Sequence, residues 1–132
     1  PMPMKLVALV STLAVLEVMV FGALVGRGRA LYGVPAPATS GHPTWERLNR
    51  VHLNSVEQLV VFLPFLWIFA FSVSQLGAAC LGLVFVVARI LYAVGYARDP
   101  ARRAPGAFLT FGVQAILGIG SLIGAILQIV RS

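Results

Sequence analysis

Four long apolar runs, separated by polar connections, constrain this sequence more than any other feature. The first run, Leu6–Val25, is about 20 residues long, which is the length that a helix needs to cross roughly 30 Å of hydrocarbon. It exceeds the short apolar core of a cleaved signal peptide, so we expect a retained helix. Further runs at about 53–73, 76–96 and 108–130 predict three more spans, and residues 1–132 then form a single membrane domain.

The composition favours the same fold class. Hydrophobic residues make up 59% of the 132 residues and charged residues only 11%, whereas soluble domains have roughly 45–50% apolar and about 25% charged residues. Too few polar side chains remain to cover a water-soluble globule. A membrane β-barrel would instead show short segments of alternating hydrophobicity. The sequence therefore predicts an all-α integral membrane protein, a bundle of four transmembrane helices.

The basic residues predict the orientation of the four spans. Arginines concentrate in two loops, at about 26–44 and 97–107, whereas the termini carry only Lys5 and Arg131. The positive-inside rule places both loops in the cytoplasm and both termini on the opposite side. This topology accounts for the net charge of +6, so we expect no nucleic-acid partner.

Local signals refine the helix ends. The second helix is expected to begin near Thr44, ahead of its membrane span, and Pro64 is a candidate kink. In the third connection, Asp99 is a candidate N-cap, and Pro100 then takes the first helical position of the fourth helix.

Three ionisable residues lie within the apolar runs, namely Glu17, Glu57 and Arg89. Such residues are costly in a membrane and face a bundle interior or a watery cavity. Their positions along the helices place all three in the cytoplasmic half. A structural ion pair between Arg89 and either glutamate is the simpler interpretation, and contact with a ligand is the alternative.

Two polar faces stand out on the second and third helices. One has the spacing i, i+4, i+7 and consists of Arg50, Asn54 and Glu57. The other has the spacing i, i+3, i+7 and consists of Arg89, Tyr92 and Tyr96. Each spacing puts its residues on one side of a helix. Arginines bind carboxylates, a carboxylate accepts from an ammonium group, and asparagine does both, so the set suits a small zwitterion with more than one carboxylate.

The segments Arg50–Glu57 and Ala88–Arg98 resemble the two signature segments of the MAPEG family, the membrane-associated proteins in eicosanoid and glutathione metabolism. The resemblance covers essentially the whole chain. It implies a homotrimer of four-helix protomers, with glutathione as co-substrate bound between neighbouring protomers near the cytoplasmic side.

The resemblance also implies residue roles. Arg103 matches the arginine that activates the thiol, and Arg102 is its alternative. No metal is implied. Gln58 stands where synthase-like members have a tyrosine, so one aromatic contact is missing. The residues that we predict to bind glutathione are Arg29, Arg50, Asn54, Glu57, Gln58, Arg89, Tyr92, Tyr96 and Arg98.

The predicted activity is that of a glutathione S-transferase, with glutathione peroxidase activity as a further possibility. The thiolate is the nucleophile, and its target is a hydrophobic electrophile or lipid that arrives from the bilayer. Cys80 has no role in this chemistry. Two alternatives stay open: a non-catalytic family member that binds a lipid or a partner protein, and a four-span proton-coupled multidrug transporter that uses Glu17.

Overall fold

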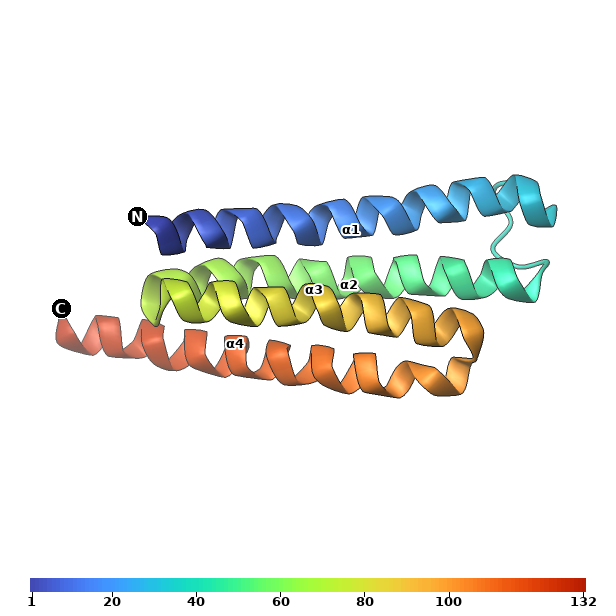
Figure 1. Cartoon of the computed structure of the whole chain (residues 1–132). Coiled ribbons are helices and arrows are strands. Elements are labelled where there is room, and N and C mark those ends of the chain that lie inside the picture. Colours follow the sequence, from blue (N-terminus) through green and yellow to red (C-terminus); the bar gives the residue numbers. More distant parts are fainter.

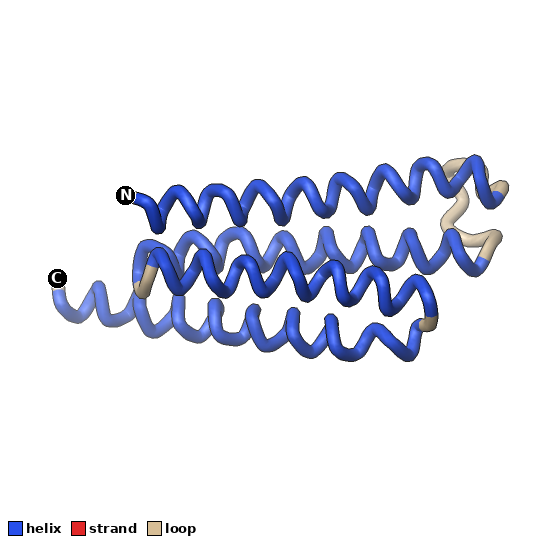
Figure 2. The backbone as a smooth tube through the Cα atoms, viewed as in Figure 1, coloured by secondary structure: helices blue, strands red, loops and turns tan.

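A computed structural model describes all 132 residues as four long helices in an up-and-down bundle (Figures 1 and 2). The elements are α1 (Met2–Tyr32), α2 (Pro43–Ser72), α3 (Gln75–Arg98), the short 3-10 helix η1 (Pro100–Arg103) and α4 (Ala104–Arg131). Both termini lie at one end of the bundle, and the α1–α2 loop and η1 lie at the other. The predicted all-α bundle with its two longer connections at one end is therefore confirmed.

All four helices are long and apolar enough to cross a membrane. Their outward faces carry many large apolar side chains, and Phe108, Phe111 and Ile129 are each more than 70% exposed. Exposed apolar surface on this scale calls for a hydrocarbon environment. The chain is therefore an integral, multi-pass membrane protein.

The helix α1 extends beyond the point where the apolar run ends. The motif Gly26–Arg29 was expected to start the loop, but the helix continues to Tyr32 and ends at Gly33, whose φ of 67° is left-handed. The extra turns pack against the start of α2. The Trp45 side chain is fully buried there, and its indole N–H donates to the Val25 carbonyl at 3.1 Å. Tertiary packing thus prolongs a helix that the local sequence would end.

The third connection is almost entirely helical. Asp99 caps η1 as predicted, because its Oδ1 accepts from the Ala101 N–H at 3.0 Å, and Pro100 follows at the first position. The first turn is of the 3-10 type, however, and α4 begins only at Ala104. The predicted loop at 97–107 is therefore reduced to a sharp corner between α3 and η1.

A regular series of side-chain hydrogen bonds joins α4 to α2. Three polar residues of α4 at seven-residue spacing, Gln114, Ser121 and Gln128, donate to backbone carbonyls of α2. The acceptors are the carbonyls of Gln58, Phe65 and Phe71, at 2.9–3.1 Å. Polar side chains in a membrane helix gain from such interhelical bonds, and these fix how α4 lies along α2.

Candidate functional site

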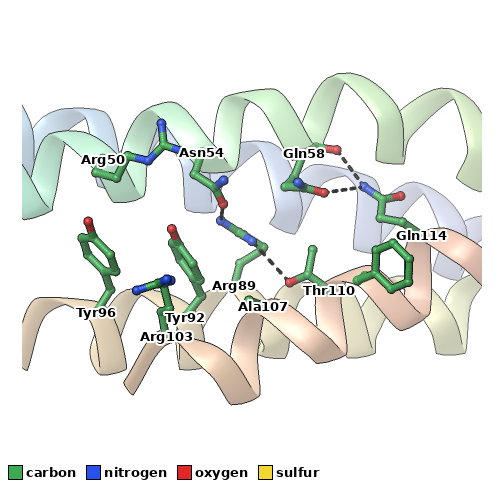
Figure 3. Close-up of a pocket in the computed structure, with 11 residues that line it drawn as sticks. Arg50, Asn54, Gln58, Arg89, Tyr92, Tyr96, Arg103, Ala107, Thr110 and Gln114 are labelled. Carbon is green, nitrogen blue, oxygen red and sulfur yellow. Dashed lines mark hydrogen bonds between the residues drawn. The ribbon is translucent and has the colours of Figure 1, made fainter. Parts of the chain in front are cut away.

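A cavity of about 480 Å³ lies between α2, α3 and α4, in the half of the bundle nearer η1 (Figure 3). Its volume falls within the range of roughly 300–1,000 Å³ that small-molecule sites occupy. The residues that line it are Arg50, Asn54, Gln58, Arg89, Tyr92, Tyr96, Arg103, Ala107, Thr110, Phe111 and Gln114.

The cavity brings together seven residues that the sequence predicted to be functional. They are Arg50, Asn54 and Gln58 from α2, Arg89, Tyr92 and Tyr96 from α3, and Arg103 from η1. On α2 the lining residues follow an i, i+4, i+8 spacing. Glu57 is not among them: its side chain is 62% exposed, and its Oε1 lies 3.9 Å from Nη1 of Arg50.

Three other predicted residues also lie outside this cavity. Arg29 holds the α1–α2 loop, because its Nη1 donates to the carbonyls of Ala38 at 2.8 Å and Val34 at 3.3 Å. Its guanidinium also lies 4.5 Å from the centre of the Trp45 ring. Arg98 and Arg102 are exposed at the corner between α3 and η1.

Arg89 is the polar centre of the bundle and is only 1% exposed. Its Nε and Nη2 donate to the Ser55 hydroxyl at 3.3 and 3.0 Å, and its Nη1 donates to Thr110 at 3.3 Å. Nη2 also donates to Oδ1 of Asn54, and the guanidinium lies 4.3 Å from the centre of the Tyr92 ring. One side chain thereby ties α3 to both α2 and α4.

The predicted ion pair between Arg89 and a glutamate is wrong. The single salt bridge in the structure joins Arg50 to Glu57. Neutral oxygens from Asn54, Ser55 and Thr110 take the donors of the guanidinium instead. Both carboxylate oxygens of Glu17 are buried without a hydrogen-bond partner.

A close approach of α4 to α3 shapes the end of the cavity nearer η1. A Cβ on Gly106 would lie 2.3 Å from the backbone nitrogen of Tyr92, so glycine is required there. The contact brings Arg103 beside Tyr92 and Tyr96, whose rings stack with centres 5.7 Å apart (Figure 3). Nη1 of Arg103 donates to the Pro100 carbonyl at 2.9 Å.

The opposite end of the cavity is formed by a pair of amides. Nε2 of Gln114 donates to the backbone carbonyl of Gln58 at 2.9 Å and to its side-chain Oε1 at 3.3 Å. Gln114 and Thr110 were not among the predicted site residues, because uncharged polar residues of the fourth span did not enter the prediction. Their spacing from Arg103, at i+7 for Thr110 and i+11 for Gln114, is helical and was a usable signal.

The electrostatics of the cavity favour an anionic ligand. Arg50, Arg89 and Arg103 line it, whereas no aspartate or glutamate does. Arginine forks match carboxylates, and a cavity lined by one sign of charge attracts the opposite sign. Two tyrosine rings and three side-chain amides add surfaces that suit a peptide-like molecule.

Comparison with known proteins identifies the family. The sequence matches the MAPEG family over residues 7–123. The chain belongs to this family. It is 43% identical over 122 residues to an uncharacterized protein of Synechocystis sp., with 92% of this chain and 89% of that one covered.

Two further relatives have named activities. Human microsomal glutathione S-transferase 2 is 37% identical over 121 residues, which cover 92% of this chain and 80% of the relative. Leukotriene C4 synthase of Bos taurus is 37% identical over 98 residues, which cover 74% of this chain and 65% of the relative. The family resemblance drawn from the two sequence segments is thus confirmed.

Proposed function

We propose that this protein is a membrane-bound glutathione transferase, which activates the glutathione thiol for attack on a hydrophobic electrophile from the bilayer. One observation carries the proposal: seven residues predicted for glutathione chemistry come from three separate elements and line one cavity. The similarity to microsomal glutathione S-transferase 2 supports the same reaction class.

The bound tripeptide would present two carboxylates and a thiol to this cavity. Arg50 and Arg103 supply positive charge near η1, and Asn54 and Gln58 supply amide donors farther into the bundle. Tyr92 and Tyr96 offer stacked rings along the side. Each polar group of the peptide then meets a complementary side chain.

Thiol activation follows from the charge of Arg103. A free thiol with a pKa of about 8.5 is only about 3% thiolate at pH 7, and a drop of about two pKa units raises that fraction roughly 25-fold. A cation within about 4–6 Å favours the anionic form. Arg103 donates one hydrogen bond within the chain and keeps its other N–H groups for a ligand. Arg102 is the alternative.

The thiolate would attack an electrophile that enters from the bilayer, without a metal or a covalent enzyme intermediate. Reduction of a lipid hydroperoxide by the same thiolate is a second outcome of this chemistry. Cys80 is exposed on α3 and does not line the cavity, so it has no role in the proposed reaction.

Assembly and orientation are part of the proposal. Arg29, Glu57 and Arg98 lie outside the cavity of one chain, so their contacts with glutathione require a neighbouring copy in a homotrimer. Both connections at the η1 end carry arginines and would face the cytoplasm. Glutathione would then enter from that side and the hydrophobic substrate from the membrane.

The test is conjugation of an electrophilic aryl halide by the purified protein. Arg103→Ala should lower turnover at least tenfold and abolish the ultraviolet absorbance of bound thiolate, while glutathione still binds. Cys80→Ala is the control and should keep full turnover. Binding of glutathione without any conjugation or peroxidase activity in the unmodified protein would favour a non-catalytic family member.

A further inference from the structure

The three lining residues of α2 form a ladder of hydrogen-bond donors. Arg50, Asn54 and Gln58 follow one another at four-residue steps along the cavity, so the ladder is about 12 Å long at 1.5 Å per residue. An extended tripeptide of similar length, at roughly 3.3–3.6 Å per residue, would lie along it. What each amide presents to such a ligand depends on which way it is turned.

The bonds within the chain decide the orientation of both amides. Arginine only donates, so Arg89 Nη2 holds the oxygen of Asn54 and leaves its amide nitrogen free. A backbone carbonyl only accepts, so Gln114 must turn its nitrogen toward the Gln58 carbonyl. That same nitrogen then also holds the side-chain oxygen of Gln58, whose own nitrogen remains free.

Neither free nitrogen is sealed off inside the protein. The amide nitrogens of Asn54 and Gln58 have no hydrogen-bond partner in the chain, and they are not buried. Both residues line the cavity, so both nitrogens are available to a ligand. By contrast, Oε1 of Gln114 is buried without a partner. An unsatisfied buried acceptor is costly. Gln114 therefore holds the orientation of Gln58 while its own side-chain oxygen stays unsatisfied.

We propose that Gln114 is a positioning residue: it locks Gln58 so that its amide N–H group binds the α-carboxylate at the γ-glutamyl end of glutathione. The proposal rests on the proposed function. The γ-glutamyl arm is the longer arm measured from the thiol, so with the thiol at Arg103 it reaches the end of the cavity that Gln58 and Gln114 form (Figure 3). Gln58 would thus replace, as a donor, the tyrosine of synthase-like members.

The test compares two ligands on the full-length protein in detergent. Glutathione is matched with 4-aminobutyryl-cysteinyl-glycine, which lacks only the α-carboxylate. The unmodified protein should bind glutathione at least tenfold more tightly, because hydrogen bonds to charged acceptors are the stronger ones. A glutamate at position 114 would accept a hydrogen bond from the amide N–H group of Gln58. The Gln58 side chain would then rotate and present its oxygen to the ligand, so Gln114→Glu should remove most of this preference.

Two controls separate positioning from general damage. Gln128→Glu alters an exposed residue at the same seven-residue spacing, bonded to Phe71 outside the cavity, and should keep the full preference. Preference for glutathione over γ-glutamylcysteine, which lacks the glycine, should be the same in Gln114→Glu as in the unmodified protein.

Several results would overturn the inference. One is an unchanged preference for the α-carboxylate in a folded Gln114→Glu protein that still binds glutathione. Another is a change in the preference over γ-glutamylcysteine instead. If the unmodified protein binds no glutathione, the proposed function fails first, so the two failures are distinguishable.

Discussion

Replacement of Arg89 by lysine keeps the charge but removes the fork that joins three helices. The guanidinium makes four hydrogen bonds, three to oxygens of α2 and one to Thr110 on α4. A lysine ammonium is a single point with three donors, so it cannot reach both helices at once. We expect the loss of about two bonds from a charged donor.

The expected cost follows from those bonds. Each hydrogen bond to a charged group contributes roughly 1.5–3 kcal/mol. Thr110 keeps its own bond to the Gly106 carbonyl at 2.7 Å, so the lower end of the range applies. Arg89→Lys should therefore destabilise the bundle by about 3 kcal/mol, or more than a hundredfold in the unfolding equilibrium constant.

The assay is unfolding in mixed detergent micelles, followed by circular dichroism. Arg98→Lys is the matched control: Arg98 is exposed and forms no side-chain hydrogen bond, so its variant should stay within about 0.5 kcal/mol of the unmodified protein. Glutathione affinity should fall in Arg89→Lys as well, because Asn54 loses the bond that orients its amide. A stability within 0.5 kcal/mol of the unmodified protein would refute the role of the fork.

Three other predictions concern packing and charge. Gly106→Ala should destabilise the bundle by more than about 1 kcal/mol in the same unfolding assay, because its Cβ meets the backbone of α3, whereas Gly112→Ala meets nothing within 4 Å and should be neutral or stabilising. Trp45→Phe removes a buried N–H donor and should cost about 1 kcal/mol; unaltered stability would show that this bond does not hold the end of α1. Arg50→Ala should weaken glutathione binding about tenfold by calorimetry, and the loss should shrink in high salt.

The fold was predictable because it depends on run length and charge, which are local properties of the sequence. The end of α1 was not, since it depends on contacts with Trp45, which lies on the other side of the α1–α2 loop. The same distinction applies to the cavity. Helical spacing predicted that Arg50, Asn54 and Glu57 share a face, whereas the residue that follows Asn54 in the cavity lining is Gln58.

The partners of Arg89 were mispredicted for a physical reason. A buried charge suggests an opposite charge, yet three neutral oxygens satisfy this guanidinium. The spacing of Asn54, Ser55 and Thr110 along their own helices does not show that their oxygens meet at Arg89. The contact of Gln114 with Gln58 was missed for the same reason, because it depends on how α4 packs against α2.

The hydrogen bonds between α4 and α2 make the two ends of the bundle depend on each other. A slide of α4 by one residue moves it 1.5 Å and turns it by about 100°, which would break all three bonds from Gln114, Ser121 and Gln128. The same turn would swing η1, and Arg103 with it, out of the cavity. Polar residues spread along α4 therefore set the alignment of the arginine that is proposed to activate the glutathione thiol.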